Sequence, residues 1–165
     1  MIIEIDIKED ARIVGTTQQE AVEEATIEAV AHVAASALKI DVEELLVDLR
    51  VDGITLERHM KVKDYVRHGH HWHHQRVCVS LHFETETADN HFPAAAHWSR
   101  VHEWACDKFT VARDVCANLE LRDGSAEGPA LNEHHEIGHH HGCKQVWLVK
   151  PGPEPNGNRG RTSES

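Results

Sequence analysis

Histidine is the residue type in this sequence with the clearest capacity for chemistry. The chain contains 16 histidines, and all but His32 follow residue 58. Most of them fall in two short segments, residues 68–74 and 134–141. Neutral imidazole is a good ligand for zinc, nickel and copper, and clustered rings supply several donors with little chain entropy to overcome. We therefore expect these segments to bind a divalent transition metal, zinc or nickel.

The expected metal ligands come from both segments and from one predicted helix. His102 and Cys106 are four residues apart, a spacing that places two side chains on one face of a helix. The full set of candidate ligands is His68, His70, His71, His73, His74, His102, Cys106, His134, His135, His139, His140 and His141. Two plainer interpretations stay open. Residues 68–74 include no carboxylate and also suit a solvated loop that binds metal adventitiously, and an exposed histidine near a small buried thiol is common on amphipathic helices.

Residues 135–139 match the pattern H-E-x-x-H, in which a helix places two imidazoles on one face and the glutamate beside the metal-bound water. This segment resembles the zincin metallopeptidases. The resemblance implies a zinc-dependent hydrolase with His135 and His139 as ligands and Glu136 as general base. The resemblance covers about eleven residues. It departs from the metzincin pattern at Gln145, which stands where that family has a third histidine ligand.

Alternation and helical spacing predict the elements of the first half. Residues 2–8 alternate isoleucine with charged residues, the period of a strand with one buried face. A capping-box pattern at Thr16 and Thr17, followed by apolar residues at helical spacing, predicts a helix over 17–38. Two β-like runs within 45–62 flank the turn dipeptide Asp52-Gly53, which predicts a hairpin.

The second half repeats the mixture of strands and helix. Residues 77–84 alternate as a half-buried strand, and the apolar run 146–149 predicts another. Pro93 suits the first position of a helix, and the apolar stripe behind it predicts a second long helix that closes near Gly124. We expect Trp147 in the core, because the run around it is apolar. The order is β-α-β-β-β-α-β, an α+β fold with a mixed sheet packed by two long helices.

The segment from Gly128 to Ile137, together with the final strand and Gly152, is similar to the G-x-x-L-x-D-x-x-I turn and the terminal L-x-L-V-x-x-x-G strand of ubiquitin. The resemblance covers residues 77–152 and implies a β-grasp-like second half with a middle strand near 117–122. A β-grasp domain presents an open sheet face and an edge to a protein partner. It also places residues 134–141 in a loop, so the two resemblances exclude each other.

Composition limits the function classes. The chain has 165 residues, 40% of them hydrophobic, and a formal net charge of −11, which favours a folded core and disfavours nucleic acid or an anionic membrane as partner. The N-terminus lacks the pattern of a signal peptide, and four cysteines without a CxxC pair do not indicate a disulfide framework, so we expect a cytoplasmic protein.

We expect an acidic α+β segment at 1–75 with the helix, hairpin and first histidine segment, a β-grasp-like segment at 76–150, and a flexible tail at 151–165. One compact domain over 1–150 is the alternative. The preferred hypothesis is a non-enzymatic, ubiquitin-like accessory module with metal-binding histidine loops and a protein partner. The alternatives are the zinc hydrolase that uses Glu136 and a pH-responsive interaction protein, since histidines titrate near neutrality.

Overall fold

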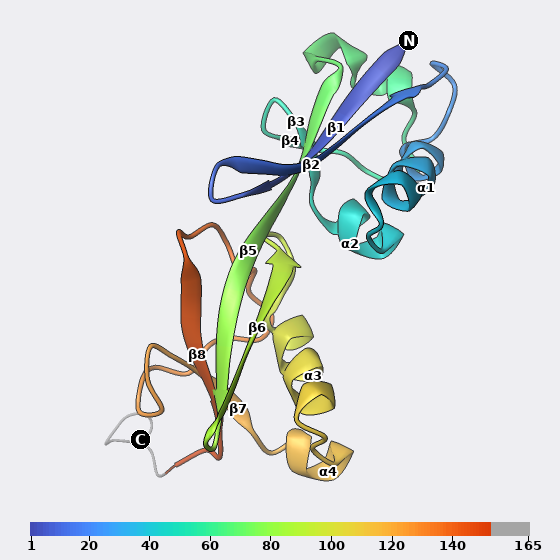
Figure 1. Cartoon of the computed structure of the whole chain (residues 1–165). Coiled ribbons are helices and arrows are strands. Elements are labelled where there is room, and N and C mark those ends of the chain that lie inside the picture. Colours follow the sequence, from blue (N-terminus) through green and yellow to red (C-terminus); the bar gives the residue numbers. More distant parts are fainter. Residues whose placement is uncertain (153–165) are drawn as a thin grey trace.

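The structure is a computed structural model and describes residues 1–152. Two lobes are joined by one long strand, β5 (His71–Phe83), as Figure 1 shows. In each lobe, helices pack on one face of the sheet. The fold is α+β with a mixed sheet, as the sequence predicts. The expected tail at 151–165 lies almost entirely outside the described residues.

The N-terminal lobe has the strand order β2-β1-β5-β3-β4. β1 is antiparallel to β2 and parallel to β5, and β3 is antiparallel to β5. Ile3, Ile5 and Trp72 pack with the apolar face of α1 in the core of this lobe. Its other elements are β1 (Ile2–Glu9), β2 (Arg12–Glu20), α1 (Ile27–Leu38), α2 (Val42–Val47), β3 (Leu49–Val51), β4 (Ile54–Thr55) and the 3₁₀ helices η1 (Val62–Asp64) and η2 (Val66–His68).

The C-terminal lobe is built around the second half of β5. β6 pairs antiparallel with one side of β5, β8 pairs parallel with the other side, and β7 is antiparallel to β8. Val79, Leu81 and Val146 pack with the buried face of α3 in a second core. The elements of this lobe are β6 (Glu86–Pro93), α3 (Trp98–Lys108), α4 (Arg113–Cys116), β7 (Glu120–Asp123) and β8 (Cys143–Val149).

The two lobes share one order of elements. In each, an antiparallel strand pair is followed by a helix, and the last strand returns parallel to the first. β5 ends the first unit and begins the second, since its residues 71–76 pair with β1 and its residues 78–82 pair with β8. The boundary expected near residue 75 therefore falls inside a continuous strand.

The first half differs from the prediction in where its helices lie. The helix expected over 17–38 begins at Ile27, because Thr26 caps it by accepting a hydrogen bond from the Ala29 amide at 3.1 Å. Residues 12–20 extend as β2 and pair along β1. The hairpin expected over 45–62 loses its first residues to α2, whose N-cap is Asp41. Its turn at Asp52 and Gly53 is confirmed, with both residues at positive φ.

The second half contains one more strand and a shorter helix than predicted. Residues 86–93 form β6, a largely polar edge strand, and Pro93 ends that strand instead of starting a helix. α3 begins at Trp98, and Thr110, which has a positive φ of 56°, lies between α3 and α4. The predicted stripe therefore spans two helices and a turn.

Trp147 is only half-buried, on the outer face of β8, and stacks on His82 with ring centroids 4.0 Å apart. Its neighbours Val146 and Leu148 point into the core. The expectation that Trp147 is a core residue is therefore wrong, because alternation along the strand separates it from its apolar neighbours.

Two disulfides correct the expectation that the cysteines form no such framework. Cys78 on β5 is bonded to Cys143, directly opposite it on β8, and Cys106 on α3 is bonded to Cys116 on α4. Strand pairing brings together Cys78 and Cys143, 65 residues apart, and the turn between α3 and α4 brings together Cys106 and Cys116, 10 residues apart. None of the helices within residues 1–152 has the length and apolar character to cross a membrane.

Candidate metal centre

The first histidine segment runs into β5, and the strand divides its rings between two faces. Successive side chains of a strand point to opposite sides of the sheet. Trp72 and His74 point into the N-terminal lobe and are fully buried. His71 and His73 lie on the outer face, which no helix within residues 1–152 covers. The alternation thus brings two rings together on one open surface.

Strand β1 supplies a carboxylate to these two rings. Asp6 is in register with His73, and its Oδ2 lies 2.5 Å from Nε2 of His71. Thr16 on β2 donates a hydrogen bond of 2.7 Å to the other oxygen, Oδ1, and so orients the carboxylate. One ligand atom each from Asp6, His71 and His73 lies within 4.8 Å of the others. Two nitrogens and one oxygen therefore form a compact donor set that could hold a metal.

The Asp6 carboxylate is inaccessible to solvent, with 0% of its side chain exposed. Burial raises its pKa, but hydrogen bonds from Thr16 and His71 and the charge on the two imidazoles outweigh burial, so its pKa lies below the ordinary value. Asp6 is therefore ionised at neutral pH. A covered carboxylate is costly unless a positive group faces it, and either a protonated imidazole or a metal ion can supply that charge.

His73 is suited to act as a neutral ligand. Burial lowers its pKa, Lys8 and His71 add to that effect, and Asp6 opposes it. Its Nδ1 is buried and has no hydrogen-bond partner within the described residues. The ring therefore keeps a lone pair at neutral pH, which is the form that binds metals. Glu4, whose carboxylate lies 3.3 Å from Nε2 of His71, adds a further oxygen at the rim.

The remaining rings of the first segment do not join this cluster. His68 ends η2, and His70 lies in the loop before β5. His74 is fully buried on the core side, where its Nδ1 lies 3.0 Å from the backbone oxygen of Asp48. Of the five predicted ligands in residues 68–74, the structure brings together His71 and His73.

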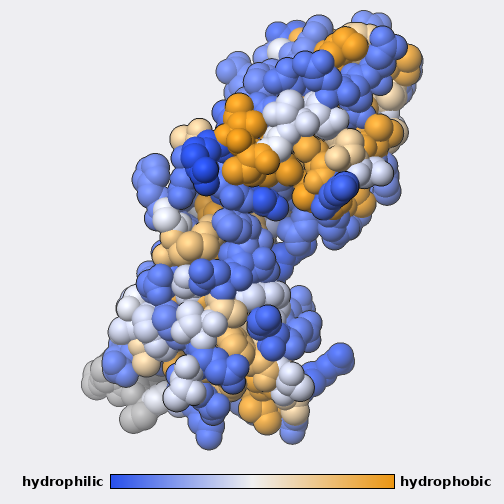
Figure 2. All heavy atoms as spheres, viewed as in Figure 1, coloured by the Kyte–Doolittle hydropathy of each residue, from blue (hydrophilic) through white to orange (hydrophobic). Residues whose placement is uncertain are grey.

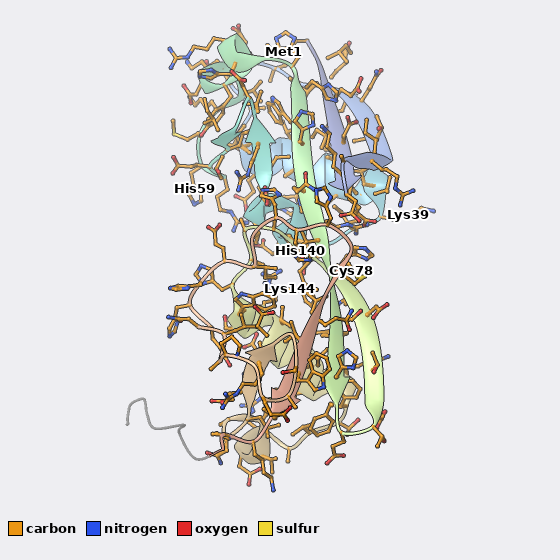
Figure 3. The ribbon with its side chains drawn as sticks, turned by 90° about the vertical axis from the view of Figure 1, so that its left-hand side faces the viewer. Met1, Lys39, His59, Cys78, His140 and Lys144 are labelled. Atoms are coloured by element: carbon orange, nitrogen blue, oxygen red, sulfur yellow. A yellow bond between two sulfur atoms is a disulfide. The ribbon has the colours of Figure 1, made fainter. Side chains whose placement is uncertain are left out.

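The second histidine segment is a loop. Residues 134–141 contain no helix, so His135 and His139 do not share the helical face that the H-E-x-x-H motif requires. Glu136 instead forms an isolated backbone bridge with His97, ahead of α3. His140 lies against Cys78, with Nε2 2.7 Å from its backbone oxygen (Figure 3). The rings of His134, His135, His139 and His141 belong to exposed residues.

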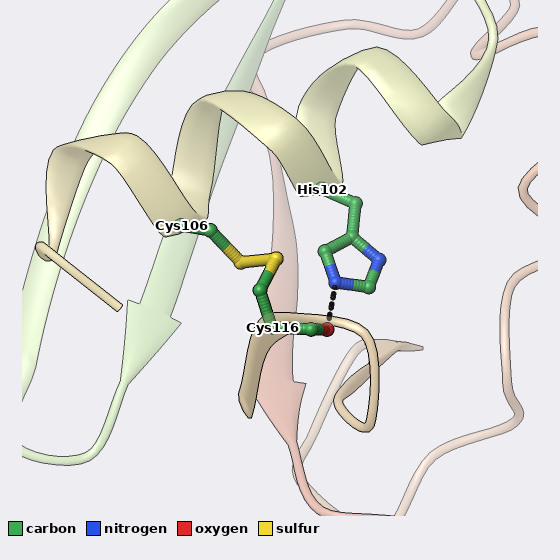
Figure 4. Close-up of side chains that lie close together, drawn as sticks. All are labelled: His102, Cys106 and Cys116. Carbon is green, nitrogen blue, oxygen red and sulfur yellow. Dashed lines mark hydrogen bonds between the residues drawn. A yellow bond between two sulfur atoms is a disulfide. The ribbon is translucent and has the colours of Figure 1, made fainter. Parts of the chain in front are cut away.

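The predicted pair on α3 has a different chemistry from the one expected. His102 is buried one helical turn before Cys106, as the spacing predicts, but the sulfur of Cys106 is bonded to Cys116 (Figure 4). A disulfide sulfur is not a thiolate, so Cys106 is not a metal ligand in this form of the protein. This corrects the expectation for Cys106.

Asp6 was not predicted as a partner of the histidines. Its place on the polar face of the first strand was visible from the alternation of residues 2–8. Which strand lies beside it was not, because parallel pairing of β1 with β5 joins residues about 65 positions apart, as the Asp6–His71 contact does. Residues 68–74 themselves contain no carboxylate, and the pairing of β1 with β5 supplies one.

No model of a known protein family matches this sequence, and a search of curated proteins finds no significant relative.

Proposed function

We propose that this chain is a non-enzymatic binding module of two β-grasp-like units, the first of which holds a divalent transition metal at Asp6, His71 and His73. The observation that carries the proposal is the meeting of two imidazoles and one covered carboxylate on adjacent strands. The β-grasp assignment rests on strand order. The C-terminal lobe has the order β6-β5-β8-β7, and strands β2-β1-β5-β3 of the N-terminal lobe have the same arrangement.

The donor set favours zinc or nickel over calcium or magnesium, which prefer all-oxygen sites. Three protein ligands leave one position of a tetrahedral zinc site for water or for Glu4. Thr16 would act as the outer partner that fixes the carboxylate. The strands hold the ligands without help from a loop, so little chain ordering would accompany binding.

A protein partner fits the distribution of apolar surface. In the part of the chain that the structure describes, all but Val115 of the exposed large apolar side chains belong to the N-terminal lobe, among them Ile13, Val22 and Val33. Figure 2 shows the stronger apolar areas on that lobe in this view. Exposed apolar patches mark interaction sites, so the N-terminal lobe is the favoured contact surface. The two disulfides favour an oxidising compartment over the cytoplasm expected from the sequence.

The test of the metal site is zinc titration of the untagged, oxidised protein by calorimetry. We expect wild-type protein to bind one zinc ion at Asp6, His71 and His73, the sheet-face site. The His71→Ala/His73→Ala double variant should lose that binding. Asp6→Asn, which keeps the size of the side chain, should weaken it by about tenfold or more. Circular dichroism checks that each variant is folded.

The matched control is His139→Ala/His141→Ala, which removes two exposed rings from the other histidine segment. This variant should keep the sheet-face site with its affinity unchanged. Equal affinity and stoichiometry in wild type and in the His71→Ala/His73→Ala variant would remove the sheet-face site from consideration.

A further inference from the structure

The disulfide between Cys106 and Cys116 lies against a buried histidine (Figure 4). His102 and Cys106 are one turn apart on α3, and Cys116 ends α4. One ligand atom each from His102, Cys106 and Cys116 lies within 4.8 Å of the others. The three side chains are therefore already gathered around one point, on elements separate from the sheet-face site.

The surroundings of the His102 ring are unusual for a neutral histidine. Nδ1 faces a carboxylate oxygen of Glu133, and Nε2 lies 2.9 Å from the backbone oxygen of Cys116. A neutral imidazole has one N–H, so only one of these two oxygens can accept a hydrogen bond from it. A carboxylate on one ring nitrogen is also the arrangement that orients metal-binding histidines, whose other nitrogen holds the ion.

The disulfide joins a partly exposed residue, Cys116, to a buried one, Cys106. It lines a surface hollow of about 780 Å³, together with Glu103, Asp107, Val111 and Arg113. The hollow gives a small thiol a path to the sulfur atoms. At the second disulfide, Cys78–Cys143, the third group whose ligand atom lies within 4.8 Å is the Asp89 carboxylate, and the nearby His140 instead contacts the backbone oxygen of Cys78. In zinc sites, thiolate ligands are combined with imidazole nitrogen more often than with carboxylate oxygen. The cluster of His102, Cys106 and Cys116 is therefore the better candidate for a zinc site.

We propose that His102, Cys106 and Cys116 form a zinc site once the Cys106–Cys116 disulfide has been reduced by a small thiol. Two thiol molecules transfer two electrons and two protons to the disulfide, the S–S bond breaks, and the two thiols leave as their own disulfide. Zinc then displaces the two thiol protons and binds two thiolates and Nε2 of His102. Glu133 keeps its place on Nδ1 and orients the ring. The chain thus exchanges a disulfide for a metal site.

The geometry needs little adjustment. Zinc lies about 2.3 Å from sulfur and about 2.0–2.1 Å from nitrogen, so tetrahedral ligands are roughly 3.3–3.8 Å apart. The sulfur atoms must separate from bonding distance, and the imidazole must turn away from the Cys116 carbonyl. Both changes are side-chain rotations within a cluster whose ligand atoms already lie within 4.8 Å.

The experiment uses the full chain with His71→Ala and His73→Ala, so that the sheet-face site does not contribute. The protein is reduced with a thiol, desalted without oxygen, and titrated with cobalt(II), whose bonds to thiolate give a charge-transfer absorption in the near ultraviolet. We expect one cobalt ion with that absorption in the reduced protein and none in the oxidised protein. Adding Cys106→Ser/Cys116→Ser should abolish the absorption, whereas the control Cys78→Ser/Cys143→Ser should keep it.

The role of the histidine and of Glu133 is tested separately. Adding His102→Ala should weaken binding of cobalt, and Glu133→Gln should weaken it by about 10–100-fold through the orientation of the ring. Absence of the charge-transfer absorption after reduction, its persistence without Cys106 and Cys116, or an unchanged affinity in the His102→Ala variant would overturn the proposal. So would a reduced protein that loses its circular dichroism spectrum and does not regain it with cobalt. None of these outcomes bears on Asp6, so this site and the sheet-face site fail independently.

Discussion

His74 differs from the other histidines of its segment because it lies inside the N-terminal lobe. Its Nδ1 donates to the backbone oxygen of Asp48, and its Nε2 has no hydrogen-bond partner within residues 1–152. Burial lowers its pKa, the Asp48 backbone and side chain oppose this, and Arg76 adds to it. The ring is therefore neutral in the folded protein. Below the ordinary pKa of 6.5 the unfolded chain binds a proton here that the folded chain does not.

Acidification below pH 6.5 should therefore destabilise the metal-free protein. The pKa of His74 is lower in the folded state than in the unfolded state, so protons bind the unfolded chain first and favour unfolding. The free energy of unfolding should fall by up to about 1.4 kcal/mol per pH unit for this one ring. His73 acts in the same direction. His74→Asn keeps a donor near Asp48 but does not titrate, so it should reduce the slope. Urea unfolding in the presence of a chelator, between about pH 5.5 and 7.5, measures it.

The matched control is His59→Asn, which replaces an exposed histidine of the same lobe. It should leave the pH dependence of unfolding as it is in the wild type. The same slope in His74→Asn and in wild type would show that His74 is not the group responsible.

At the scale of elements, the start of α1 is where local sequence and structure differ most. The capping-box pattern at Thr16 and Thr17 is sound chemistry, but the residues around it belong to β2, where Thr16 bonds to Asp6. The hydroxyl of Thr26 takes the capping role.

Thr26→Ala should lower the free energy of unfolding by about 1 kcal/mol, and Thr26→Ser should keep most of the wild-type stability, because serine retains the acceptor oxygen. Thermal and urea unfolding compare the three proteins, and equal stability in Thr26→Ala would contradict the cap.

The elements that the sequence predicted well are those with a strong local signal. Local sequence is enough to determine three of them, the strands over residues 2–8 and 77–84 and the turn at Asp52-Gly53. β6 was missed because an edge strand has no need of the apolar residues that mark a buried one. The start of β5 at His71 was missed for a related reason. A run of histidines resembles a polar loop, and the alternation of the buried Trp72 and His74 with His71 and His73 is apparent only in the structure.

The proposed metal site shows the same limit. His71 and His73 were predicted as ligands, but Asp6 enters only through the register between β1 and β5, which no local pattern encodes. The disulfides are decided in the same way. Cys78 and Cys143 are paired residues on two parallel strands, and Cys106 meets Cys116 because the chain turns back between α3 and α4. Residue types thus indicated the chemistry, and strand pairing selected which of them meet.

At the scale of the whole molecule, the two lobes are joined by β5 and by contacts beside it. The Asp48 carboxylate, buried in the N-terminal lobe, accepts a hydrogen bond of 3.0 Å from the Ala95 amide of the C-terminal lobe. Arg100 on α3 donates to Glu44 on α2 at 2.7 Å. A strand shared by two sheets loses pairing on both when it detaches, so we expect the lobes to unfold together.

This coupling can be tested by weakening only one core. Leu81 is fully buried in the C-terminal lobe, and Leu81→Ala should destabilise the protein by about 2–5 kcal/mol. If β5 joins the lobes into one cooperative unit, hydrogen exchange followed by mass spectrometry should become faster in both lobes, by similar factors in the best-protected peptides of β1 and β8. Val115→Ala, at an exposed side chain, serves as the control and should leave exchange unchanged. Faster exchange in β8 with unchanged protection in β1 would mean that each lobe unfolds alone, and that the continuity of β5 carries no coupling between them.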